Sequence, residues 1–170
     1  MKAPLSKQWL TRLNGAEFKV WKLQEGPSPE DRKVADNPET VVEYLLSQIG
    51  TSVAYRPDCE NLMVIYLSAR LRPIGWQVVS NGTLDTLLVS AASVFKGAIV
   101  TGAYAIILAH NHPSGDPSPS ESDIKVTREM MMAGQLLKIN LMDHIILGHA
   151  TSERPKAWVS LRELGYFYDL

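Results

Sequence analysis

Two histidines lie two residues apart in the stretch "AHNHPSGDPSPSESD", which runs from Ala109 to Asp123. Side chains at positions i and i+2 of a β-strand point to the same face of the sheet. His110 and His112, at the end of a strand, can therefore direct both imidazoles to one point. Neutral imidazole is a common zinc ligand, at a distance of about 2.0–2.1 Å. The pair indicates a candidate metal site that needs a third protein ligand.

Asp123 is the candidate for that third ligand. It follows His112 by eleven residues, and the segment between them is rich in Pro, Gly and Ser, which favour turns. If Ser120 caps a helix, Asp123 lies in its first turn, where the helix dipole favours a carboxylate. Three protein ligands leave the fourth position of a tetrahedral ion open for water, as a catalytic zinc site requires.

Hydrolysis of an amide needs two further groups. A carboxylate must take a proton from the attacking water and pass it to the leaving amine, and a donor must support the developing oxyanion. Ser120 offers a hydroxyl for the second task. The first requires a glutamate from elsewhere in the chain.

A purely structural interpretation competes with the metal site. A histidine in a strand is more often structural or exposed than a ligand, and Ser120 with Asp123 also fits a helix capping box. His144, inside an apolar strand-like stretch, is more consistent with a core or supporting residue than with a ligand. Spacing alone leaves both the metal site and the simple cap open.

The flanking elements predict one α/β domain. The apolar run Tyr104–Ala109 leads as a buried strand into His110, and Ser120 starts a helix of about eighteen residues. Residues 1–36 are expected to be an irregular extension with a candidate short strand at Glu17–Leu23, and residues 37–170 to form a mixed β-sheet flanked by helices. Further predicted elements are a helix at Glu39–Gly50 capped by Asn37, strands at Leu62–Leu67, Ile74–Val79, Leu84–Val89 and Asn140–His149, a turn at Asn81–Gly82, and a helix within Ser90–Ala103.

The composition narrows the function classes. The 170 residues carry a formal net charge of −1 with scattered basic residues, which makes direct nucleic-acid binding unlikely. No apolar run is long enough to span a bilayer, and the first residues lack a signal-peptide core. With Cys59 as the only cysteine, no intrachain disulfide can form. We expect a cytoplasmic protein with no membrane partner.

At the histidine loop the sequence resembles a known family. His110, His112, Ser120 and Asp123 fit the JAMM (MPN+) signature, in which His-x-His is followed after seven residues by Ser and after two more by Asp. The stretches "DHIILG" (Asp143–Gly148) and "SLRELG" (Ser160–Gly165) resemble the RadC-like branch of that superfamily. The resemblance covers Asn37 to Phe167 and implies a single-domain JAB/MPN-like fold, which is cytidine-deaminase-like.

The resemblance also implies a function. Members of the superfamily are zinc-dependent hydrolases of peptide or isopeptide bonds, which implies one Zn²⁺ per chain held by His110, His112 and Asp123. Glu60 precedes the first predicted strand, where the family places its general acid/base, and Ser120 would support the oxyanion. The implied partner is a peptide or protein substrate.

Two positions depart from the RadC-like pattern. Ser68 stands where an aspartate usually ends the first strand, and Ser93 where a glutamate usually opens the following helix. If that glutamate rather than Glu60 supported the water, this chain would be impaired. The alternatives are a RadC-type DNA-repair-associated protein and a non-catalytic interaction module that binds one metal. The sequence leaves the substrate and the oligomeric state open.

Overall fold

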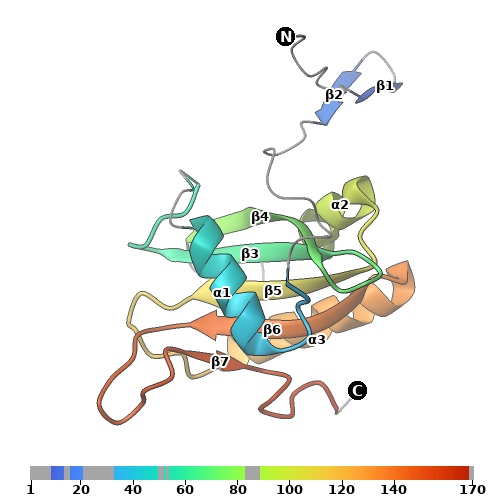
Figure 1. The fold of residues 1–170 in the computed structure, drawn as a ribbon. Coiled ribbons are helices and arrows are strands. Elements are labelled where there is room, and N and C mark those ends of the chain that lie inside the picture. Colours follow the sequence, from blue (N-terminus) through green and yellow to red (C-terminus); the bar gives the residue numbers. More distant parts are fainter. Residues whose placement is uncertain are drawn as a thin grey trace.

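The computed structural model describes residues 9–13, 16–20, 33–49, 52, 54–82 and 89–168. Within them a five-stranded mixed sheet has the order β4-β3-β5-β6-β7, in which β5 and β6 run parallel and the other pairs antiparallel. The predicted α/β domain is therefore confirmed (Figure 1). Its elements are α1 (Pro38–Ile49), β3 (Glu60–Leu67), β4 (Pro73–Gly82), α2 (Ala91–Thr101), β5 (Ala105–Asn111), α3 (Glu121–Leu137), β6 (Asn140–Leu147) and β7 (Trp158–Ser160).

The sheet separates two hydrophobic layers. α1 crosses one face, and α2 and α3 cover the other (Figure 1). Because side chains alternate along a strand, Met63 and Ile107 pack in the layer of α1, whereas Leu62 and Leu108 pack in the layer of α2 and α3. This alternation decides which side of the sheet each polar residue at a strand end must occupy.

The central strand β5 is buried along its whole length. All seven of its residues are buried, because β3 and β6 pair with its two edges and helices cover both faces. An apolar run such as Ile106–Leu108 suits this position. Truncating fully buried Leu108 to Ala should cost about 2–5 kcal/mol of unfolding free energy. The strand therefore gives His110 a rigid base.

Asp143 joins the two C-terminal stretches that carry the family resemblance. Its carboxylate accepts hydrogen bonds from the Ser160 hydroxyl at 2.7 Å and from the backbone N–H groups of His144 at 2.7 Å and Arg162 at 3.2 Å. Burial raises the pKa of Asp143, and these hydrogen bonds oppose that shift. Asp143 thus fastens the turn after β7 to β6.

The structure corrects the predicted turn and the expectation that residues 1–36 are irregular throughout. Asn81–Gly82 is not a turn but the end of β4, because both residues pair with the start of β3. Within residues 1–36, β1 (Trp9–Leu13) pairs antiparallel with β2 (Ala16–Val20), and β2 covers the start of the candidate strand Glu17–Leu23. The helix predicted to start after Asn37 does so, with the Asn37 carboxamide accepting the Thr40 N–H at 2.9 Å. Most of the predicted strand Leu84–Val89 lies outside the described residues.

Among the described residues, no helix combines the length and apolarity that a membrane crossing requires.

Candidate metal centre

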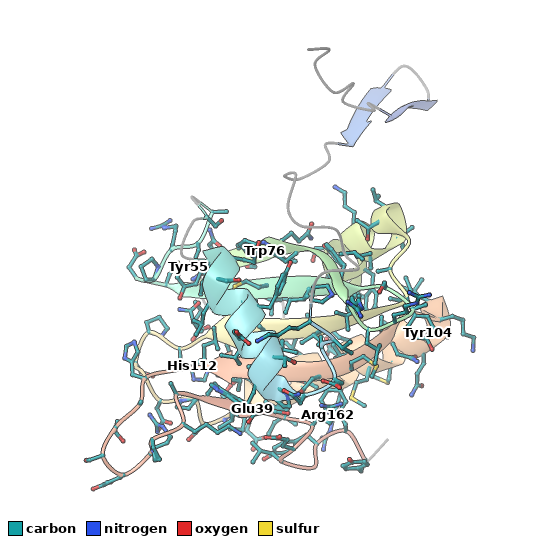
Figure 2. The ribbon with its side chains drawn as sticks, in the orientation of Figure 1. Glu39, Tyr55, Trp76, Tyr104, His112 and Arg162 are labelled. Carbon is teal, nitrogen blue, oxygen red and sulfur yellow. The ribbon has the colours of Figure 1, made fainter. Side chains whose placement is uncertain are left out.

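The candidate ligands gather where β5 ends and α3 begins. His110 has the same parity as Leu108 and so faces α3, while Asn111 faces the other side. Figure 2 shows His112 at the opposite end of the sheet from Tyr104, which precedes β5. The backbone N–H of His112 still bonds the Leu147 carbonyl at 2.8 Å, which continues the pairing with β6. The two imidazoles therefore share one side of the sheet, as the spacing predicted.

A tight turn sends the chain from β5 to α3. The Gly115 N–H bonds the His112 carbonyl at 2.9 Å, and Gly115 has a φ of 82°, which L side chains rarely adopt. A Cβ on Gly115 would also lie 2.7 Å from the His149 ring. Glycine is thus required by both the backbone angle and the close approach of the neighbouring loop.

The start of α3 confirms the predicted cap and places Asp123 beside the histidines. The Ser120 hydroxyl accepts the Asp123 N–H, and the Asp123 carboxylate accepts the Ser120 N–H at 2.7 Å, which completes a capping box. The Asp123 side chain is only 2% exposed, and its carboxylate faces both imidazoles. The helix-cap interpretation and the metal-site interpretation are therefore compatible, because Asp123 both caps α3 and faces the two histidines.

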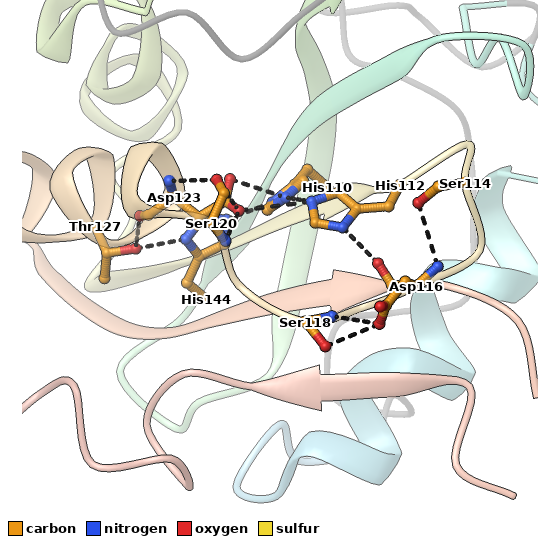
Figure 3. Close-up of polar contacts among 9 residues, drawn as sticks. All are labelled: His110, His112, Ser114, Asp116, Ser118, Ser120, Asp123, Thr127 and His144. Carbon is orange, nitrogen blue, oxygen red and sulfur yellow. Dashed lines mark hydrogen bonds and ion pairs between the residues drawn. The ribbon is translucent and has the colours of Figure 1, made fainter. Parts of the chain in front are cut away.

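Three potential ligand atoms converge on one position (Figure 3). His110 Nε2 lies 2.9 Å from His112 Nε2 and 3.1 Å from Asp123 Oδ1, and His112 Nε2 lies 3.5 Å from Asp123 Oδ2. Two ligands of a tetrahedral zinc ion would stand about 3.3 Å apart. His110, His112 and Asp123 thus form a group that can hold a metal ion. The His110 side chain is fully buried and that of His112 is 13% exposed, so the group meets solvent at His112.

The outer nitrogen of His112 is held by the loop that follows it. His112 Nδ1 lies 2.6 Å from the Asp116 carbonyl, which can only accept, so this nitrogen carries the hydrogen and Nε2 is the atom available to a metal. Arg154 steadies the loop, because its guanidinium donates to Asp116 Oδ1 at 3.0 Å and to the Gly115 carbonyl at 2.8 Å. A charged side chain from a distant loop thus supports the His112 contact.

Burial and hydrogen bonds shift the pKa values of all three residues in the group. The hydrogen bond to Asp123 raises the pKa of His112, whereas burial lowers the pKa of His110 despite the same carboxylate. Burial alone would raise the pKa of Asp123, but the hydrogen bonds from the two imidazoles and Ser120 outweigh it and hold this pKa well below its usual range. The carboxylate is therefore ionised at neutral pH and attracts a cation.

Glu60 opens β3 on the same side of the sheet. The register pairs Leu62 with His110, and its continuation by two residues places Glu60 opposite His112. The charge of Glu60 adds to the rise in the pKa of His112 and opposes the lowering of the pKa of His110. Asn61 and Asn111 brace this end from the other face, because Asn111 Oδ1 accepts from the backbone and side-chain N–H groups of Asn61 at 3.0 and 2.8 Å.

Ser120 lies beside Asp123 with its hydroxyl already engaged. Its Oγ donates to Asp123 Oδ2 at 2.6 Å while accepting the Asp123 N–H. The two departures from the family pattern make local contacts instead: Ser93 Oγ donates to the Ser90 carbonyl in the α2 cap, and Ser68 Oγ accepts the Arg72 N–H in a turn.

Sequence reasoning overlooked the supports of the site. Thr127 follows Asp123 by four residues, so the two side chains lie on the same face of a helix. This spacing could have identified Thr127 as a neighbour of Asp123. Arg154 and the Asp116 carbonyl carry no such signal, since a backbone atom has no sequence signature and Arg154 joins the loop only through folding. His144 is fully buried beside His110, which agrees with its prediction as a supporting residue.

Comparison with known proteins identifies relatives of this chain. The family model described as RadC-like JAB domain matches residues 35–166. The chain is 38% identical to a UPF0758 protein of Symbiobacterium thermophilum over 84% of this chain and 56% of the relative. It is 43% identical to one of Moorella thermoacetica over 69% and 49% of the two chains, and 36% identical to one of Desulfitobacterium hafniense over 96% and 71%.

The chain spans about half the length of most of these curated relatives. The matched region contains the whole five-stranded sheet, its three helices and the His110–His112–Asp123 group. On this match, and on the fold and the ligand geometry that accompany it, the chain belongs to the RadC-like JAB domain family.

Proposed function

We propose that this protein is a zinc-dependent hydrolase of the JAMM type that cleaves peptide or isopeptide bonds. The observation that carries the proposal is the convergence of two imidazole nitrogens and one carboxylate, all within 4.8 Å of one another, at a corner that meets solvent. Two histidines and one carboxylate form a ligand set typical of catalytic zinc. When bound, zinc would polarise a substrate carbonyl and lower the pKa of a water.

Glu60 is the proposed general acid and base. Its half-buried side chain stands at the open end of β3, opposite His112, where substrate can approach. Glu60 takes the proton of the attacking water and returns it to the amine that leaves, so the carboxylate is regenerated after each cycle. The Asn61–Asn111 contacts support this role by fixing the backbone next to Glu60.

Ser120 is the proposed oxyanion donor. To serve in this way its hydroxyl must turn from Asp123 Oδ2, to which it donates at 2.6 Å, toward the substrate oxygen. This engagement favours a second candidate function, a metal-binding module without turnover, in which Ser120 only orients Asp123.

The test combines metal content with cleavage. Purified protein should contain about one zinc per chain, and His112→Ala should lose it. The zinc-loaded wild type should cleave members of a mixed peptide library, detected by mass spectrometry, and Glu60→Gln should bind zinc without cleaving. Glu43→Gln, which alters an exposed pair with Lys33, is the matched control and should behave as wild type.

Two outcomes would contradict the proposal, each in a different part. If zinc binds but the zinc-loaded wild type leaves every peptide of the library intact, the metal-binding module is the better account. If Glu60→Gln cleaves as the wild type does, the proton-transfer group is a different residue.

A further inference from the structure

His144 lies outside the proposed ligand set, yet both of its ring nitrogens are engaged. The ring is fully buried on β6. Its Nε2 lies 2.8 Å from His110 Nδ1, and its Nδ1 lies 2.7 Å from Thr127 Oγ1 (Figure 3). The buried imidazole of His144 thus forms the middle of a hydrogen-bonded chain between Thr127 and His110.

The direction is set at the backbone of α3. Thr127 Oγ1 lies 2.6 Å from the Asp123 carbonyl, which can only accept, so the single hydroxyl hydrogen points there. Thr127 Oγ1 must then accept from His144, which places a hydrogen on His144 Nδ1. The ring of His144 is fully buried, and its two partners are a hydroxyl and an imidazole. With Nδ1 donating, Nε2 is the nitrogen that accepts.

The same logic fixes His110. Its Nδ1 faces the lone pair of His144 Nε2 and must therefore donate to it. The other nitrogen, His110 Nε2, lies 2.9 Å from His112 Nε2 and 3.1 Å from Asp123 Oδ1, and it is the atom left for a metal. The hydrogen-bonded chain thus runs from the Asp123 carbonyl through Thr127 and His144 to His110 Nδ1.

We infer that His144 and Thr127 are positioning residues that select the Nδ1–H form of His110 and thereby aim its Nε2 lone pair at the metal. This inference rests on the proposed function and adds which residues orient His110 as a zinc ligand. The hydrogen-bonded chain links β5, β6 and α3, so the two buried ligands, His110 and Asp123, are oriented as one unit. The outer partner of His110 is an imidazole, whereas a metal-binding histidine more often donates to a carboxylate, a carbonyl or water.

The structure offers a matched pair of hydroxyls for the test. Thr127 on α3 and Thr101 on α2 each donate to the carbonyl four residues earlier, at 2.6 and 2.8 Å. Thr127→Val removes the acceptor of His144 Nδ1 with little change in volume, whereas Thr101→Val removes an equivalent bond far along the chain. Thr127→Ser keeps the hydroxyl and should restore what Thr127→Val loses.

Two readouts follow, one of them on metal-free protein. Long-range ¹H–¹⁵N NMR of the metal-free wild type should show a hydrogen on Nδ1 of both His144 and His110. Thr127→Val should lower the fraction of molecules that carry these two hydrogens, and chelator competition should show a zinc Kd raised roughly 10–100-fold. His144→Leu should have the same effect, with partial rescue in His144→Gln, whose amide oxygen can accept from His110 Nδ1.

The inference is overturned if Nδ1 of wild-type His110 carries no hydrogen. It is also overturned if Thr127→Val and His144→Leu keep the wild-type zinc Kd, or if Thr101→Val weakens zinc as much as Thr127→Val does. Neither readout uses turnover, so this inference and the hydrolase proposal fail by different results.

Discussion

Ser120 and Asp123 form reciprocal hydrogen bonds at the first turn of α3. The Asp123 carboxylate that completes this cap also faces His110 and His112. Asp123 Oδ2 accepts from the Ser120 N–H and hydroxyl, while Oδ1 lies 3.1 Å from His110 Nε2. The cap therefore fixes the rotation of a candidate metal ligand. Local helix chemistry and the metal centre depend on the same two residues.

Ser120→Ala separates these roles when compared with Ser90→Ala. Both serines cap a helix by accepting an N–H three residues on, so each variant should lose about 0.5–2 kcal/mol of unfolding free energy. Only Ser120→Ala should also raise the zinc Kd, because only it frees the Asp123 carboxylate. Urea unfolding and chelator competition measure the two effects. Equal zinc affinity in the two variants would show that the cap does not orient the ligand.

Arg154→Gln tests the support of His112. Loss of the guanidinium removes the contacts with Gly115 and Asp116, so the carbonyl that holds His112 Nδ1 becomes mobile. We expect the zinc Kd to rise several-fold. Arg56→Gln, which alters an exposed pair with Asp58, should leave it unchanged. A wild-type Kd for Arg154→Gln would restrict Arg154 to a surface role.

Zinc affinity should increase with pH. The hydrogen bond to Asp123 raises the pKa of His112 above its usual 6.5, and its proton must occupy Nε2 because Nδ1 already donates to Asp116. Below that pKa zinc must displace the proton, so affinity falls as pH decreases, and above it affinity levels off. Titrations in buffers of different ionisation enthalpy should detect proton release. If the zinc Kd does not change between about pH 5.5 and about pH 8.5, a range that includes the reference pKa of histidine, then zinc does not displace a proton from His112 Nε2.

Asp143→Asn tests the buried carboxylate behind β7. Burial raises the pKa of Asp143 above 3.8, so its ionisation opposes folding. The stability advantage of the protonated form is complete below pH 3.8 and is lost as pH rises through the folded-state pKa. The asparagine variant lacks this term, so its stability relative to wild type should improve with rising pH, by at most about 1.4 kcal/mol per unit. Urea unfolding at several pH values measures the trend, and the opposite trend would refute it.

The sequence was sufficient to predict the fold class and the three candidate ligands because each has a local signal. The i, i+2 histidines follow an apolar strand, and Asp123 follows a serine that caps a helix. Asn81–Gly82 misled the prediction because pairing with β3 overrides the turn preference of the dipeptide. The partner of His110 depends on the register that sets β6 beside β5, and the partner of His112 is a backbone carbonyl, so neither contact can be read from spacing.

Anomalous diffraction at the zinc edge, from crystals of the zinc-loaded protein, tests the central claim most directly. The account predicts one peak per chain at about 2.0–2.2 Å from His110 Nε2, His112 Nε2 and an Asp123 carboxylate oxygen, with the remaining position open toward solvent beside Glu60. A map in which zinc is absent from this position, or is held by other side chains, would contradict it.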